Sequence, residues 1–196
     1  MTILYLHGFR SSPLSFKARL LAARMRQLGL QEQWLCPQLP AEPRQAIQLA
    51  LDLAQGCAAR DLALIGSSLG GYYATWLAER LGCKAVLLNP AVAAARDLAT
   101  QVGVSTDYHT GAPFEFLPGY VDQLRELAVP AITRPERYFL LAATGDEVLD
   151  WREMVAHYPG ARQHVVHGSD HGLSDFPDHM DAVLEFCGVD TARCPT

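Results

Sequence analysis

The sequence predicts an α/β fold in which a parallel sheet lies between helices on both faces, as a three-layer α/β/α sandwich. Two observations carry this prediction. Apolar runs of strand length alternate along the chain with segments whose apolar residues recur at helical spacing. The strand-like runs are also apolar on both faces, which is typical of strands buried within a parallel sheet. A chain of 196 residues, 49% of them hydrophobic, has enough apolar residues to fill the core of a single domain.

Six strands are expected in chain order. Each is a short apolar run that stops at a glycine, a proline or a polar loop. They cover residues 3–6, 33–36, 62–66, 84–88, 138–143 and 163–166.

Proline, serine and glycine mark the helices between these strands. Ser12 is expected to cap a helix that begins at Pro13, has Phe16 in its apolar stripe and ends at Gly29. Pro43 opens the next helix, whose apolar residues recur with a period close to 3.6. The other helices of the alternation are expected directly after residue 68 and at about 151–157 and 177–186.

The alternation breaks down between residues 91 and 135. Two helices are expected there, at 93–102 and 119–128, and residues 106–118 between them are expected to form a loop. The position of the segment suits a partial lid, and a loop-rich packing segment is the alternative. No linker marks a second domain, so we expect a single domain over residues 1–188 and a polar tail over 189–196.

A G-x-S-x-G motif, Gly66 to Gly70, follows the third expected strand and precedes a helix. In this setting the motif forms a nucleophile elbow, which exposes the hydroxyl of Ser68 at the carboxyl end of a central strand. The turn strains Ser68 and brings strand and helix so close that Cβ atoms at 66 and 70 would collide. An ordinary strand–helix turn is the alternative. Ser67 lies off the centre of the motif and is expected to make local hydrogen bonds.

A nucleophilic serine needs a neighbouring base, and the base needs an orienting carboxylate. Among seven histidines, His171 lies in a loop after the last strand, between small residues that let its ring project. Asp146 directly follows the fifth strand, so its carboxylate is expected at the same edge of the sheet as Ser68. Asp150 is the competing acid, but with Glu153 it is expected to form the capping box of the next helix.

An oxyanion formed at Ser68 would need hydrogen-bond donors. The backbone N–H of Leu69 is one candidate, and the N–H of Phe9, in the loop after the first strand, is the other. His7 is expected to shape that loop by hydrogen bonding. Glu147 is expected to point away from the site.

Composition narrows the class of protein. The net charge is −5, from 16 basic and 21 acidic residues without a long run of one sign, which argues against a nucleic-acid partner. No stretch has the length of a membrane helix, and the amino terminus lacks the features of a signal peptide. Five cysteines without C-x-x-C spacing are expected to be reduced and mostly buried in a cytoplasmic protein, with Cys194 the most exposed.

Four stretches together resemble a known family. They are H-G-F-x-S-S-P after the first strand, G-S-S-L-G-G-Y-Y-A-T at the elbow, T-G-D-E-V-L-D after the fifth strand and the final G-x-D-H-G. The chain is similar, from Leu4 to about Phe186, to the YqiA-type small bacterial esterases of the α/β-hydrolase superfamily. The resemblance implies a trimmed α/β-hydrolase fold without the usual first two strands. It also implies hydrolysis of carboxylic esters or acyl thioesters with Ser68, Asp146 and His171 as the triad.

We therefore expect a serine hydrolase that acts on a small-molecule ester or thioester and needs no cofactor or metal. A non-catalytic module of the same fold, which binds a ligand or a protein, is the alternative. A metal hydrolase is a second alternative. Its candidate ligands are His164, His167, Asp170 and His171, but strand alternation places the first two on opposite faces. The sequence leaves the oligomeric state open. The candidates for an apolar acyl pocket are Tyr72, Tyr73, Tyr108, Phe114 and Phe116.

Overall fold

The computed structural model describes residues 1–192, and its main feature is a six-stranded sheet. The strands are β1 (Thr2–Leu6), β2 (Trp34–Leu35), β3 (Leu62–Ser67), β4 (Lys84–Leu88), β7 (Tyr138–Ala143) and β8 (Arg162–Val166). Their order across the sheet is β2-β1-β3-β4-β7-β8, and each neighbouring pair is parallel. The predicted sheet of about six parallel strands is confirmed.

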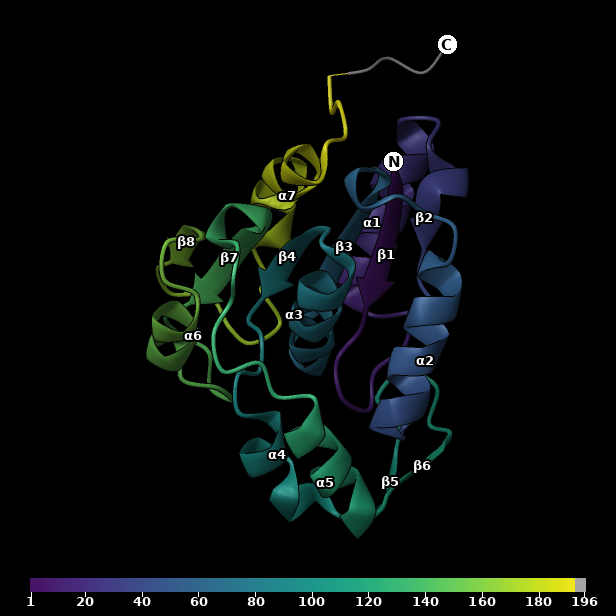
Figure 1. Ribbon diagram of the computed structural model, residues 1–196, viewed down its shortest axis with the longest axis vertical. Coiled ribbons are helices and arrows are strands. Elements are labelled where there is room, and N and C mark those ends of the chain that lie inside the picture. The colour runs from purple at the N-terminus through teal and green to yellow at the C-terminus, as the bar shows by residue number, and fades with distance from the viewer. Residues whose placement is uncertain (193–196) are drawn as a thin grey trace.

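Helices cover both faces of the sheet, as predicted (Figure 1). One face packs against α2 (Pro43–Ala54), α3 (Leu69–Leu81) and α6 (Trp151–His157), and the other against α1 (Phe16–Gln27) and α7 (Met180–Cys187). Successive strand residues point to opposite faces. In β1, for example, Leu4 and Leu6 enter the first core, whereas Ile3 and Tyr5 enter the second.

Helix α1 begins three residues later than predicted. The Oγ of Ser12 accepts a hydrogen bond from the N–H of Leu14 (3.2 Å), which closes a local turn over Pro13. The helix therefore starts at Phe16, after an N-cap, Ser15, whose side chain makes no capping bond. The later start also changes the buried face, since Phe16 is 42% exposed. Lys17, Ala18, Leu21 and Met25 are buried instead.

The segment between β4 and β7 differs from the prediction in two places. The expected helix at 93–102 is divided into α4 (Ala94–Asp97) and a 3-10 turn (Ala99–Gln101), and no side chain caps either piece. Residues 103–116, which overlap the loop expected at 106–118, form an antiparallel hairpin of β5 (Gly103–Thr106) and β6 (Pro113–Phe116). Its turn is closed by the Oδ1 of Asp107, which accepts the N–H groups of His109 and Thr110. Helix α5 (Pro118–Glu126) lies close to its predicted position.

This segment lies at one end of the molecule, and the amino terminus and the last described residues lie at the other (Figure 1). The arrows of the strands point toward α4, α5 and the hairpin, so the segment borders the carboxyl edge of the sheet. At the far end Val189 packs into the second core, and the carbonyl of Thr191 accepts a hydrogen bond from Arg24. The described chain is therefore held to the domain beyond residue 188.

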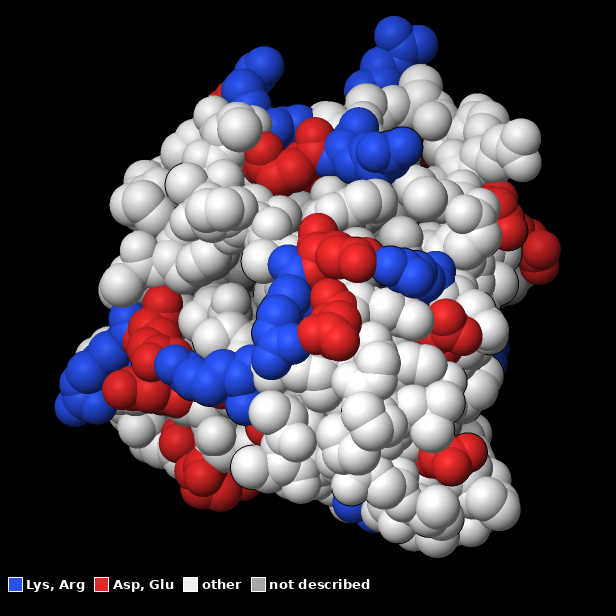
Figure 2. Space-filling view, turned by 60° about the horizontal axis from the view of Figure 1, so that its bottom comes forward, with Lys and Arg blue, Asp and Glu red and all other residues white. Residues whose placement is uncertain are grey.

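Charged residues are spread over the surface and are partly paired. Arg44 binds Glu126, and Arg96 binds Asp97 and Glu153. Figure 2 shows one face on which basic and acidic side chains lie beside one another between wide uncharged areas. No helix within residues 1–192 combines the length and the apolar character needed to cross a bilayer.

The cysteines that the structure describes are free thiols. Cys83 and Cys187 are buried, and Cys36 and Cys57 are partly buried. Cys194, predicted to be the most exposed, lies outside the described residues.

Candidate active site

Ser68 occupies a strained turn between β3 and α3. Its backbone has φ 55° and ψ −120°, a conformation that side chains other than glycine rarely adopt. The turn is tight because a Cβ at Gly66 would overlap the backbone of Gly70, and a Cβ at Gly70 would overlap the carbonyl oxygen of Leu6. The close approach predicted for these two glycines is confirmed, although the backbone that excludes a Cβ at Gly70 belongs to β1.

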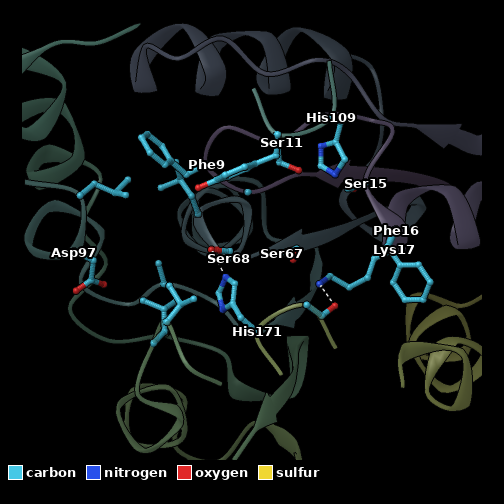
Figure 3. Close-up of a pocket in the computed structure, with 18 of the residues that line it drawn as sticks. Phe9, Ser11, Ser15, Phe16, Lys17, Ser67, Ser68, Asp97, His109 and His171 are labelled. Atoms are coloured by element: carbon cyan, nitrogen blue, oxygen red, sulfur yellow. Dashed lines mark hydrogen bonds between the residues drawn. The ribbon is translucent and has the colours of Figure 1, made fainter. Parts of the chain in front are cut away.

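The structure brings Ser68, His171 and Asp146 into one hydrogen-bonded row. The Nε2 of His171 lies 3.1 Å from the Oγ of Ser68, and its Nδ1 lies 2.8 Å from the Oδ2 of Asp146. A proton on Nδ1 is donated to the carboxylate, so the lone pair of Nε2 can accept the hydrogen bond of the serine hydroxyl. In Figure 3 the ring of His171 points at Ser68 across the floor of a cavity.

The carboxylate of Asp146 is fully buried and held by three donors. Besides the histidine, the N–H groups of Val148 and Leu149 each donate to Oδ1 at 2.8 Å. The turn that carries Asp146 packs directly on the loop that carries His171. The N–H of Gly145 donates to the carbonyl of Gly168 (2.7 Å), and a Cβ at Gly145 would overlap this loop. The acid and the base are thus positioned by one shared contact.

The neighbouring acidic residues take other roles. Asp150 caps α6 as predicted, because its Oδ1 accepts the N–H of Arg152 (2.9 Å). Glu153 does not complete a capping box, since both its oxygens bind the guanidinium of Arg96. The prediction for Glu147 was wrong. Its side chain turns toward the site and accepts the backbone N–H of His171 (3.0 Å), which has no sheet partner in its loop.

Asn89 is a positioning residue that the sequence analysis missed. It follows β4, is completely buried and has φ 43°. Its Nδ2 donates to the carbonyls of Asp170 and His171, and its Oδ1 accepts the N–H of Ala143. One side chain thereby joins the ends of β4 and β7 to the histidine loop. A signal was present in the sequence, since this is the chain's single asparagine and it directly follows a strand beside the elbow.

The two expected oxyanion donors lie at the same cavity as Ser68. Phe9 and Leu69 both line it, and Gly8 is so near that a Cβ there would come within 3.2 Å of the Cβ of Ser68. Within residues 1–192, neither the N–H of Phe9 nor that of Leu69 donates a hydrogen bond to a protein group. Both N–H groups are therefore available to donate a hydrogen bond to a bound oxygen.

The loop after β1 is shaped by its side chains. The Nε2 of His7 accepts the N–H of Leu39 (2.9 Å) and its Nδ1 donates to the carbonyl of Gly8 (3.0 Å), as predicted for a structural histidine. Burial lowers the pKa of His7, which favours its neutral form. Arg10 turns away from Ser68, since its guanidinium lies 4.3 Å from the ring centre of Tyr108 and its Nε binds the carbonyl of Thr106.

The cavity above Ser68 has a volume of about 590 Å³, which is within the range of small-molecule sites. Its apolar part is lined by Phe9, Leu98, Val148 and Leu149. Of the five aromatic residues expected as pocket candidates, Tyr108 is at its wall. Tyr72, Tyr73 and Phe116 are buried in the core, and Phe114 packs on Phe9.

Three of the four residues weighed as metal ligands have other contacts, and the fourth, His167, is exposed. The ring of His164 packs against His179 at 4.9 Å, and the Oδ1 of Asp170 accepts the N–H of Ser174. His171 belongs to the row with Ser68. Among the residues that the structure describes, no three His, Cys, Asp or Glu side chains gather in a metal-binding arrangement.

The sequence of the whole domain matches a known family. A model described as "Uncharacterised protein family (UPF0227)" matches residues 2–188. The chain belongs to UPF0227. The YqiA-like membership predicted from the four motifs is thereby confirmed.

Solved structures show which fold this UPF0227 member has. A protein from Agrobacterium vitis S4 is similar over 95% of this chain and 87% of its own, with a TM-score of 0.71 and 19% identity. Est1E from Butyrivibrio proteoclasticus, solved with ferulic acid bound, is similar over 94% and 87%, with a TM-score of 0.64 and 15% identity. An esterase domain from Rhodothermus marinus is similar over 99% of this chain and 88% of its own length, with a TM-score of 0.62 and 20% identity. The chain therefore has the α/β-hydrolase fold and resembles esterases in structure.

Proposed function

We propose that this UPF0227 member is a serine hydrolase that cleaves carboxylic esters or acyl thioesters through an acyl-enzyme on Ser68. The observation that carries the proposal is the row from Ser68 Oγ through His171 to Asp146, with spacings of 3.1 and 2.8 Å. A hydroxyl, an imidazole and a buried carboxylate in this order form the arrangement that activates a serine for acyl transfer.

In the first half of the reaction the Oγ of Ser68 attacks the substrate carbonyl while the Nε2 of His171 takes its proton. Asp146 holds the ring in the required tautomer and stabilises the imidazolium. The N–H groups of Leu69 and Phe9 donate to the oxyanion of the tetrahedral intermediate, aided by the amino-terminal end of α3. His171 then gives its proton to the leaving oxygen or sulfur, and the acyl group stays on Ser68.

In the second half a water molecule replaces the leaving group. His171 removes a proton from the water, which attacks the acyl carbon, and the same two N–H groups bind the new oxyanion. The carbonyl re-forms, Ser68 recovers its proton from His171, and the carboxylic acid is released. Because one imidazole moves every proton, these reaction steps require no metal or organic cofactor.

The decisive variant is Ser68→Ala. Its turnover of 4-nitrophenyl acetate is expected to fall by on the order of 10³-fold or more, because the oxyanion donors alone retain little of the rate. A variant that hydrolyses this ester as fast as the parent would refute the proposal.

Covalent labelling separates a hydrolase from a binding module of the same fold. A fluorophosphonate should label the parent and Ser67→Ala, whose elbow serine is intact, but not Ser68→Ala. A parent that stays unlabelled while correctly folded would favour the non-catalytic alternative.

Two further experiments address the metal alternative and the leaving group. Turnover is expected to be equal before and after EDTA treatment. A panel of ester, thioester, lactone and amide substrates would identify the leaving group.

A further inference from the structure

Lys17 is a buried cation in the wall of the cavity that contains Ser68. It lies in the first turn of α1 and is 7% exposed. Its Nζ donates to the carbonyl of Gly172 (2.5 Å), the residue after His171. Figure 3 shows the side chain running along the wall toward the histidine loop, with this bond dashed. Within residues 1–192, no carboxylate lies within 4.0 Å of Nζ.

One hydroxyl near Lys17 has a free hydrogen-bonding capacity. Ser15, the N-cap of α1, lines the same cavity, and its buried Oγ has no hydrogen-bond partner in the described part of the chain. The helix has neither a side-chain cap nor an acidic residue in its first turn. Its amino-terminal N–H groups and partial positive charge therefore add to the charge of Lys17. Asp97, which also lines the cavity, binds Arg96 through Oδ1 at 2.8 Å, and its buried Oδ2 has no partner in the described part of the chain.

A buried ammonium without an ion pair is unfavourable for the fold. Burial lowers the pKa of Lys17 to about 8, and the charges of Asp170 and Asp146 oppose the shift. The group is therefore still mainly protonated at pH 7. Perturbed cations of this kind gather at sites where a ligand supplies the missing partner.

We propose that Lys17 and Ser15 form a subsite for a carboxylate of the substrate, which lies in the cavity beside the scissile carbonyl. The inference rests on the proposed hydrolase activity and adds the class of substrate, an ester or thioester that carries an anionic group. The ammonium and the hydroxyl together present donors to the two carboxylate oxygens. The carboxylate belongs either to the acyl chain or to the leaving group, and both arrangements place it in the same cavity.

A purely structural role for Lys17 makes a different prediction. If the bond to Gly172 served only to position the loop of His171, its loss would slow neutral and anionic substrates by the same factor. If Lys17 binds a carboxylate, its loss would slow anionic substrates more than neutral ones. The quantity to measure is therefore the ratio of kcat/KM for the anionic ester to kcat/KM for the neutral ester.

Two matched pairs of esters test the proposal. Mono-4-nitrophenyl adipate and 4-nitrophenyl hexanoate differ by a carboxylate for a methyl group at the end of the acyl chain. The pair 4-acetoxybenzoate and 4-methylphenyl acetate differs in the same way on the leaving group. The parent should prefer the anionic ester of at least one pair by about tenfold or more in kcat/KM, as expected for a hydrogen bond between charged groups.

Three variants assign the preference to Lys17. In Lys17→Met the ratio should fall to about one for the acyl-chain pair and, for the leaving-group pair, to the ratio set by the two leaving groups. Lys17→Gln keeps a donor for the carbonyl of Gly172 without the charge, and its ratio should fall as well. Lys84→Met is the control, because Lys84 is the other lysine of the chain, is exposed and donates to the carbonyl of Phe186. Its ratio should match the parent.

The outcomes separate the two proposals. A parent that cleaves the neutral esters through Ser68 but shows no preference in either pair would overturn the subsite and leave the hydrolase assignment intact. An unchanged ratio in Lys17→Gln and Lys17→Met would overturn it too, as would an equal loss on both esters. A folded parent that cleaves none of the four esters would count against both proposals.

Discussion

Single residues around the site adopt backbone conformations that are unfavourable for their type. Within residues 1–192 the non-glycine residues with positive φ are Arg10, Ser68, Asn89, Ser169 and Leu173. All five lie in the loops at the carboxyl edge of the sheet, where the row of Ser68, His171 and Asp146 is built. Each conformation costs on the order of 1 kcal/mol. Such strain persists where the surrounding contacts fix the chain, and it is typical of functional sites.

Asn89 allows the contribution of one such residue to be measured. Asn89→Gly tolerates the positive φ but loses the hydrogen bonds to Asp170, His171 and Ala143. Its free energy of unfolding should fall by about 2–4 kcal/mol, since buried backbone groups lose their partners. The kcat should fall more than KM changes, because the histidine loop is no longer fixed.

Asn89→Ala serves as the comparison for the backbone. It loses the same bonds and must also hold φ near 43°. Its free energy of unfolding, measured in urea, should therefore be about 1 kcal/mol lower than that of Asn89→Gly. If Asn89→Gly equals the parent in both stability and kcat, the side chain has no positioning role.

At the scale of elements, the β5–β6 hairpin is attached to the loop after β1. The ring of Phe9 makes edge-to-face contacts with Phe114 and Phe116, each with 5.1 Å between ring centres. The N–H of Tyr108 also donates to the carbonyl of Arg10 (2.8 Å). The hairpin therefore supports the backbone that carries the proposed oxyanion donor. This contact is of the kind expected for a packing segment, and the partial lid expected for residues 91–135 stays a prediction.

Phe114→Ala tests this support. Phe114 is partly buried, so its loss should affect stability less than that of Phe116, which is buried in the core. If the contact of about 0.5–1.5 kcal/mol acts in the transition state, kcat should fall by about 2- to 13-fold with little change in KM. Val104→Ala, at a hairpin position that is 77% exposed, is the control and should match the parent in steady-state kinetics. If Phe114→Ala and Val104→Ala have equal kcat values, the hairpin does not support the oxyanion donor.

At the scale of the whole molecule, the buried charge of Lys17 couples stability to pH. Its pKa is about 8 in the folded chain, against an ordinary value of 10.5. A lysine with a lowered folded pKa destabilises the fold most at low pH, where both states are protonated. The penalty decreases as the pH rises from about 8 toward 10.5, because the folded state releases its proton first.

The free energy of unfolding of the parent should therefore rise relative to Lys17→Met by about 2 kcal/mol between pH 7 and pH 9.5. At pH 7 the variant should be the more stable protein, because methionine fills a similar volume without a charge. Chemical denaturation at several pH values measures the difference. A difference that stays constant over this range would contradict a desolvated ammonium.

The local pattern of the sequence determined the layers and the main site residues. Strands with apolar residues on both faces had to be buried in a parallel sheet, and the carboxyl ends of parallel strands meet at one edge. Ser68, Asp146 and His171 could therefore be expected together from their places after three strands. Gly66 was predictable from the tight turn itself, whereas the exclusion of a Cβ at Gly70 depends on the neighbouring strand β1.

Side-chain contacts decided the rest, most of them between distant segments. The hairpin was missed because its strands are short and because its apolar partner, Phe9, lies in a distant loop that contacts Phe114 and Phe116. The start of α1 depended on a turn made by Ser12, and the direction of Glu147 on the N–H of His171. Asn89 and Lys17 became significant only when the fold placed the carbonyls of Asp170, His171 and Gly172 within their reach. Periodicity reports which face of an element is buried, whereas the partner of a polar group is set by how the elements pack.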